Sequence, residues 1–162
     1  MSYFYNVNTK TEIIASLIKL DTPTTTAAGG RFSLSGTVNG SASIVSNRLR
    51  LVAGSSYYIE ASAILYNPNA SGSLVYGVYD QTNSVYLHEC ISAFDPTLSY
   101  TKCQRYCTSA LILDSDITTT MDVEIRIQSI AGSGWDLTVT ANGIGPYNFV
   151  GYPSLRLLEL PS

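Results

Sequence analysis

The sequence has few charged residues and few of the residue types that perform catalysis. Lysine, arginine, aspartate and glutamate make up 13% of the 162 residues, and there are one histidine, one tryptophan and three cysteines. Ordinary globular domains carry about a quarter charged residues. The surface must therefore be built from serine, threonine, asparagine, glycine and the twelve tyrosines. Such a surface suits close packing against neighbouring molecules.

The patterns that are absent exclude two classes of partner. The net charge is −3 and no basic run exists to neutralise phosphates, which argues against nucleic acid. No apolar run approaches the roughly 18 residues that a membrane span requires. The first ten residues, MSYFYNVNTK, lack the basic start, apolar centre and cleavage site of a signal peptide. We therefore expect a protein that is made in the cytoplasm of its producer and binds no membrane.

The stretch 47–66, NRLRLVAGSSYYIEASAILY, has the pattern that the rest of the chain repeats. From Tyr57 onward, apolar residues fall on one face of an extended chain, which is the period of a strand with one buried side. The segment 53–56 supplies turn chemistry before it. The repeating unit is therefore strand, turn, strand, and no long helical period competes with it.

The expected strands are short and separated by turn signals. In chain order they lie at 12–20, 31–34, 42–45, 47–52, 57–66, 74–79, 85–90, 110–113, 121–129, 135–141 and 154–160. The first also fits one face of a short helix, and we prefer the strand. The stretch 91–107 has no period and is predicted to be a long crossover loop. Short strands at roughly 8–12-residue spacing indicate an all-β, antiparallel β-sandwich of jelly-roll type.

Length and pattern predict one domain with a short arm. A chain of 162 residues is the size of one domain and can bury roughly two-thirds of its unfolded surface. We expect residues 12–162 to form this domain. Residues 1–11 are polar and aromatic without a period, so we expect an arm that orders only against another molecule. Its anchors would be Tyr3, Phe4 and Tyr5.

The last expected strand is apolar on both faces. Leu155 and Leu157 lie on one face, and Leu158 and Leu160 lie on the other. A strand that is apolar on both sides is buried on both sides. In a two-layer sandwich one face meets the core. The other face must therefore meet a neighbouring chain or a covering loop.

Four segments carry a resemblance to a known family. They are RLRLVAGSSYYIEASAILY, VYGVYDQTNSVYL, TTTMDVEIRIQSIAG and the closing PSLRLLEL. Together they resemble the compact head domain of bacteriophage fibre and decoration proteins, over roughly residues 13–160. That family has a jelly roll similar to tumour necrosis factor and the complement globular head. The segment 89–108, which carries the cysteines, has no counterpart in the family pattern.

The resemblance implies a homotrimer on a virion surface, with Arg126 as a framework or trimer residue. It implies that the following residues form the framework or the trimer interface: Tyr57, Tyr58, Leu155, Leu157, Leu158 and Leu160. Because only about ten residues precede the first expected strand, we expect no fibre shaft. We therefore expect a capsid decoration or cement protein that binds the major capsid protein or another virion protein. The alternative is the receptor-binding tip of a short fibre or spike, which would grip host glycan with exposed tyrosines and Trp135.

Enzyme chemistry has little support. Any Ser-His-Asp arrangement must use His88, and no G-x-S-x-G motif is present. A small hydrolase that depends on His88 is the remaining catalytic hypothesis. The segment 114–116, Asp-Ser-Asp, could offer two carboxylates to calcium, but an isolated D-x-D in a loop is usually a turn.

The chemically suggestive cluster is His88, Cys90, Cys103 and Cys107, because the single histidine and every cysteine fall in one segment. Four such ligands can close a tetrahedral zinc site, and the C-x3-C spacing is usual for ligands. An odd number of cysteines also suits one disulfide with a free thiol. Buried inert thiols are the third state. The sequence leaves all three open.

Overall fold

The structure, a computed structural model, describes residues 12–24, 27–66, 72–94, 103–132 and 153–161. At 22, 64–66, 90–94, 103–106 and 161 it describes the backbone alone. The arm anchors Tyr3, Phe4 and Tyr5 lie outside the described residues, as do Trp135 and the expected strand at 135–141.

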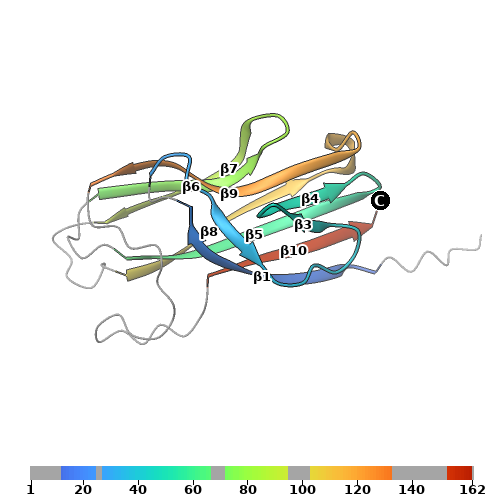
Figure 1. Cartoon of the computed structure of the whole chain (residues 1–162), viewed down its shortest axis with the longest axis horizontal. Helices are drawn as coiled ribbons and strands as arrows, with labels where there is room; N and C mark the ends of the chain where they lie inside the picture. The colour runs from blue at the N-terminus through green and yellow to red at the C-terminus, as the bar shows by residue number, and fades with distance from the viewer. Residues whose placement is uncertain (1–11, 25–26, 67–71, 95–102, 133–152, 162) are drawn as a thin grey trace, which may run out of the picture.

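The described chain forms two antiparallel sheets of five strands each, packed as a sandwich (Figure 1). Sheet I has the order β2 (Phe32–Ser35), β1 (Ile14–Pro23), β10 (Ser154–Pro161), β5 (Ser55–Tyr66) and β8 (Cys103–Ile112). Sheet II has the order β3 (Ser43–Val45), β4 (Arg48–Val52), β9 (Thr120–Ala131), β6 (Gly72–Asp80) and β7 (Val85–Phe94). Chain neighbours are often not sheet neighbours, which is the connectivity of a jelly roll.

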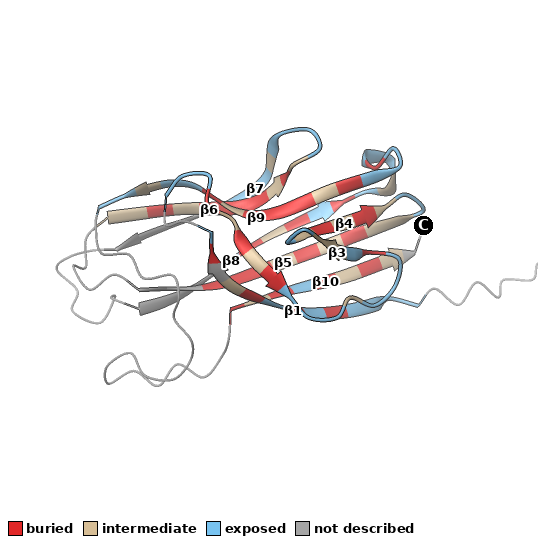
Figure 2. Cartoon of the chain, in the orientation of Figure 1, coloured by how far each residue is buried: buried red, intermediate tan, exposed pale blue. Residues whose placement is uncertain are grey.

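The core lies between the sheets and follows the period of two. Tyr57, Ile59 and Ala61 of β5 face it from sheet I, and Val123 and Ile125 of β9 face it from sheet II. Figure 2 shows buried and more exposed positions alternating along the central strands. Every second residue therefore supplies apolar area that folding removes from water. The inward side of β9 is the one predicted from its sequence.

Within the stretch 91–107, the described residues 91–94 and 103–107 are strand, which corrects the prediction of a long loop there. β7 continues to Phe94, and β8 begins at Cys103. The reason is that both segments pair residue by residue with a neighbouring strand. β5 pairs with β8 from Tyr57 to Tyr66, and β6 pairs with β7 back to Gly72. Backbone hydrogen bonds to a long partner hold a strand even where its own side chains have no clear period.

Two further predictions concern single elements. The ambiguous segment 12–20 lies in β1, a strand, as preferred. The segment 114–116 forms a short 3-10 helix, η1 (Asp114–Asp116). Within the described residues, no helix has the length and apolar character that a membrane crossing requires.

Candidate functional site

The outer face of sheet I carries an apolar row that crosses four strands. Cross-strand register aligns Ala15 of β1, Leu158 of β10, Tyr58 of β5 and Leu111 of β8. Leu17 stands beside this row on β1 and is 73% exposed, and Leu111 is 58% exposed. We call Leu17, Tyr58, Leu111 and Leu158 the apolar stripe. Large contiguous apolar surface on a soluble domain marks an interaction site.

One arginine and one glutamate adjoin the apolar stripe. Arg156 is aligned with Leu17 on one side and with Glu60 on the other. The Tyr58 hydroxyl donates to Glu60 Oε2 at 3.5 Å, a long hydrogen bond. The face thus presents apolar area with one charge of each sign.

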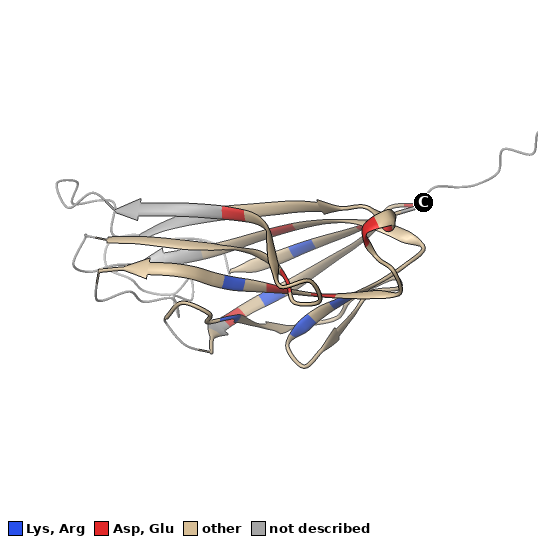
Figure 3. Cartoon of the chain, turned by 90° about the horizontal axis from the view of Figure 1, so that it is seen from above, with Lys and Arg blue, Asp and Glu red and all other residues tan. Residues whose placement is uncertain are grey.

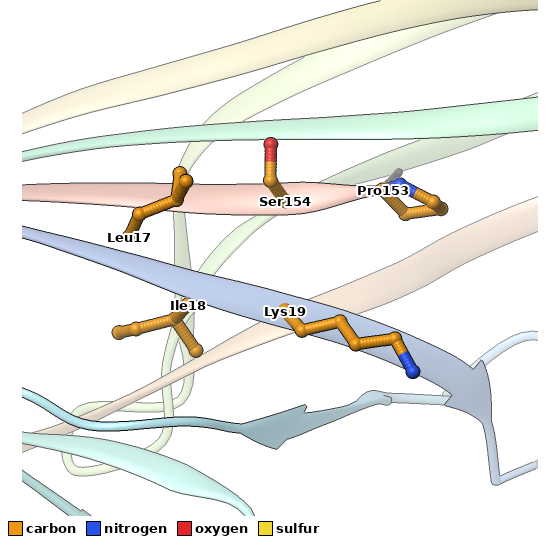
Figure 4. Close-up of a pocket in the computed structure, with 5 residues that line it drawn as sticks. All are labelled: Leu17, Ile18, Lys19, Pro153 and Ser154. Atoms are coloured by element: carbon orange, nitrogen blue, oxygen red, sulfur yellow. The ribbon is translucent and has the colours of Figure 1, made fainter. Parts of the chain in front are cut away.

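A cavity lies beside the stripe where β10 begins (Figure 4). Its volume is about 300 Å³, and its lining is mainly apolar. The lining residues are Leu17, Ile18, Lys19, Pro153 and Ser154. The cavity extends the apolar character of this face.

The structure places the predicted trimer residues on two different faces. Tyr58, Leu158 and Leu160 are half-buried, and Tyr58 and Leu158 are aligned on the outer face of sheet I. Tyr57, Leu155 and Leu157 are at most 1% exposed and belong to the core of the single subunit. Their assignment to an interface is therefore corrected, because a strand alternates its sides and these residues already have their cover.

The hydroxyl of Tyr57 explains how so large a residue is accommodated in the core. It donates to the Val52 carbonyl at 3.0 Å and shares a 2.6 Å hydrogen bond with Ser41 Oγ. Its ring fills the core while its polar atom is satisfied. Tyr57 thus has a framework role.

The outer face of sheet II is charged and internally paired. Glu124 of β9 is 3% exposed and accepts from Arg31 at 3.1 Å and from Arg48 at 2.7 Å. Asp122 accepts two hydrogen bonds from Arg50, at 2.8 and 3.0 Å. Figure 3 shows basic and acidic positions on neighbouring strands of the sandwich. Hydrogen bonding to Arg50 holds the pKa of Asp122 below its ordinary value.

Arg31 reaches sheet II because the connection from β1 to β2 crosses over to β9. Gly29 N–H donates to the Ile127 carbonyl, and Ile127 N–H donates to the Gly30 carbonyl. Gly29 has φ +86°, a conformation that glycine adopts readily. The sequence showed a turn at this glycine pair, but no local signal connected Arg31 with Glu124.

Next to the paired charges lies an aromatic group. The Arg126 guanidinium stands 4.4 Å from the centre of the Tyr79 ring, and Tyr79 meets Tyr86 edge to face at 4.8 Å. Burial raises the pKa of Tyr86, and the nearby Arg126 opposes that rise. We call Tyr79, Tyr86 and Arg126 the aromatic-arginine cluster. Of these residues, only Arg126 is assigned a role from the sequence, as a framework or trimer residue.

The hairpin between β6 and β7 is fixed by a buried carboxylate. Asp80 is 1% exposed. It accepts from the backbone N–H of Thr82 and Asn83 and from Asn83 Nδ2. An aspartate that caps its own turn in this way explains the D-x-T-N segment of the sequence.

A second buried carboxylate closes the sandwich at the end of β10. Glu159 is 8% exposed. It accepts from Ser41 N–H, Ser41 Oγ and Ser55 Oγ, each at 2.8 Å. Burial acts to raise the pKa of Glu159, but the three hydrogen bonds outweigh it and hold that pKa below the ordinary value. This residue was not predicted, because a lone glutamate in a leucine-rich strand gives no pattern.

The predicted zinc ligands are described in part. His88 Nδ1 lies 3.1 Å from Thr108 Oγ1, which joins the edge strands β7 and β8 of the two sheets. Cys107 is an exposed free thiol. Because neighbouring residues of a strand point to opposite faces, Cys107 points away from the Thr108 side chain that His88 contacts. The side chains of Cys90 and Cys103 lie outside the described residues, so zinc binding stays a prediction.

The described residues contain no group of three or more histidines, cysteines or acidic residues that could hold a metal ion. Asp114 Oδ1 accepts from Gly54 N–H, and Asp116 Oδ2 accepts from Leu113 N–H. Asp114 therefore holds the turn between β4 and β5, and only Asp116 serves its own segment.

Comparisons with known proteins give the fold. No family model matches the sequence, and no curated protein matches it. Murine APRIL, a jelly roll of the tumour necrosis factor family, aligns over 92% of this chain and 100% of its own, with a TM-score of 0.55 and 11% identity. A carbohydrate-binding module of Cellvibrio mixtus lichenase 5A, in complex with cellotriose, aligns over 89% of this chain and 96% of its own, with a TM-score of 0.35 and 14% identity. The first likeness confirms the predicted jelly-roll β-sandwich. The second is too low to carry an argument.

Proposed function

We propose that this chain is a homotrimeric structural protein of a bacteriophage virion, most simply a capsid decoration or cement protein. It works by binding and has no catalytic activity. A jelly-roll sandwich fits a binding or structural role. The resemblance of its strand segments to phage head domains supports the virion assignment.

The apolar stripe is the observation that carries the proposal. It crosses β1, β10, β5 and β8, so it presents one continuous area instead of scattered leucines. Burying apolar surface contributes about 25 cal/mol per Å². A second copy is a fitting occupant, because Arg156 and Glu60 offer one charge of each sign to the same pair on a neighbour. Copies around a closed axis would cover the stripe on each subunit.

The absence of catalysis is part of the proposal. His88 is exposed at the seam of the sandwich and bonds to Thr108. Within the described residues no carboxylate hydrogen-bonds to His88, so it lacks the acidic partner that orients the histidine of a catalytic triad. Replacing His88 with alanine would leave shell binding unchanged.

The experiment has two readouts. Sedimentation at micromolar concentration should give three times the subunit mass of 17.5 kDa. Purified phage shells should then withstand higher temperature when the protein is bound. A folded single subunit at that concentration would contradict the trimer. A trimer that leaves shell stability unchanged would contradict the cement role alone.

A further inference from the structure

The aromatic-arginine cluster holds a cation with no carboxylate partner. In the described part of the chain, the ion pairs on this face join Arg31 and Arg48 to Glu124 and Arg50 to Asp122. Arg126 is not among them. Its guanidinium lies against the Tyr79 ring at 4.4 Å. A guanidinium that stacks by its flat face keeps its N–H edge for an acceptor.

The charge around the cluster favours an anion. Glu124 is shared by two arginines, so the pair of Arg31 and Arg48 is not fully neutralised by it. The other nearby carboxylate is Glu89, which accepts from Gln128 Nε2. Three guanidiniums therefore face two carboxylates on a protein whose net charge is −3. The local balance is opposite to that of the whole chain.

A glycine makes this arrangement possible. Gly77 of β6 is aligned with Arg126 on one side and with Glu89 on the other. A Cβ at Gly77 would lie 2.1 Å from the His88 carbonyl oxygen, so the position excludes every larger residue. No side chain therefore stands between Arg126 and Glu89. Arg126 can lean over β6 and lie on Tyr79, two residues along that strand.

We propose that this cluster binds an acidic sugar, a uronic or sialic acid unit of a surface glycan. The Arg126 edge takes the carboxylate with paired hydrogen bonds. Tyr86, the half-buried second tyrosine of the cluster, offers an apolar ring face to the sugar ring. Glu89 and Gln128 supply an acceptor and a donor to sugar hydroxyls. A simple inorganic anion would use the arginine but not the tyrosines, and a neutral sugar would not use the arginine.

The location of the site is compatible with the trimer and independent of it. The cluster lies on the outer face of sheet II, and the apolar stripe lies on the outer face of sheet I. Association through the stripe leaves the cluster open. Several weak sites on one oligomer then act together on a polymeric glycan. This inference goes beyond the proposed function, because a cement role requires no glycan.

The test uses the full chain and two sets of oligosaccharides, one bearing sialic or glucuronic acid and one with the same carboxylates reduced to alcohols. The wild type should bind the acidic set at least tenfold more tightly. R126Q should remove that preference, and Y86A should weaken binding to both sets. R50Q is the matched control, because Arg50 is already engaged by Asp122.

Equal binding of the two sets by the wild type, or no binding of either, would overturn the proposal. An equal loss in R50Q would also overturn it, because binding would then follow charge alone. If R126Q does not fold, R126K tests the same contact, because it keeps the charge and loses the paired donors. The logarithm of its affinity ratio between the acidic and the reduced oligosaccharides should be at most half of the wild-type value. Sedimentation of the same samples reads the trimer separately, so failure here leaves the proposed function standing.

Discussion

The two outer faces of the sandwich differ in the side chains that they present to solvent. Sheet II places charges on its outer face and pairs them across strands, as Glu124 is paired with Arg31 and Arg48. Sheet I places leucine and tyrosine there and covers them with nothing in the described chain, so that Leu17 is 73% exposed. A face with its own partners is finished within one subunit. A face without them needs another molecule.

On the two outer faces, the extent of burial does not follow the polarity of the residue. Glu124 is charged and buried because its own neighbours fold over it. Leu158 is apolar and only half-buried although it lies in a central strand of its sheet. In a β-sandwich the outward-facing positions of a strand are ordinarily polar. In the proposed assembly, sheet I is therefore the side that forms the subunit contact and sheet II is the side that stays open.

The largest expected effect comes from placing a charge in the apolar stripe. L111R should convert the trimer to single subunits at micromolar concentration, because an unpaired cation would be buried at each contact. Leu111 is 58% exposed in one subunit, so the variant should still fold. Sedimentation velocity measures the outcome, with circular dichroism as the check of folding.

The matched control for L111R is V85R. Val85 is 48% exposed and lies at the start of β7 in sheet II, where no subunit contact is expected. V85R should remain trimeric. If both variants dissociate, or neither does, the difference between the two faces has no bearing on assembly.

Sequence and structure agree where a residue's environment depends on its own strand. The alternation of β9 was sufficient to predict that Val123, Ile125 and Ile127 face the core. The leucines of the last strand were correctly expected on two faces. The prediction that all of them form an interface was not correct, because Leu155 and Leu157 meet the core of the same subunit.

The rest of the site depends on register, which a single strand does not encode. The apolar stripe exists because Leu158 is aligned with both Ala15 and Tyr58. The pairing of Arg31 with Glu124 joins residues 93 positions apart. Neither contact has a local signal. The same holds for 91–94 and 103–107, where strand structure depends on pairing with β6 and β5.

An intermediate effect should follow from breaking the paired charges of sheet II. E124A leaves Arg31 and Arg48 without their shared acceptor. We expect a loss of about 2–4 kcal/mol in the free energy of unfolding, less than for a fully buried pair because both arginines are partly exposed. Urea unfolding at constant protein concentration measures it. The trimer should persist, since this face makes no subunit contact in the proposed assembly.

R50Q is the internal comparison for E124A. The Arg50 side chain is 39% exposed, so solvent screens its pair with Asp122. Relative to the wild type, the urea midpoint of R50Q should fall by clearly less than that of E124A. Equal losses would show that the buried position of Glu124 adds nothing to the strength of its contacts.

The smallest expected effect concerns Glu159, the carboxylate that sheet I holds with serines instead of arginines. Its folded pKa is lower than its unfolded one, so its contribution to stability is complete above about pH 4.3, the ordinary glutamate value. That contribution is lost as pH falls through the lowered pKa. Asp122 and Asp21 also have lowered pKa values and add to acid unfolding.

The variant E159Q isolates the effect of Glu159, because both aspartates are retained in it. Its stability deficit relative to the wild type should be largest near pH 6 and should shrink below pH 4. A deficit that stays constant over this range would mean that the hydrogen bonds from Ser41 and Ser55 do not favour the charged form.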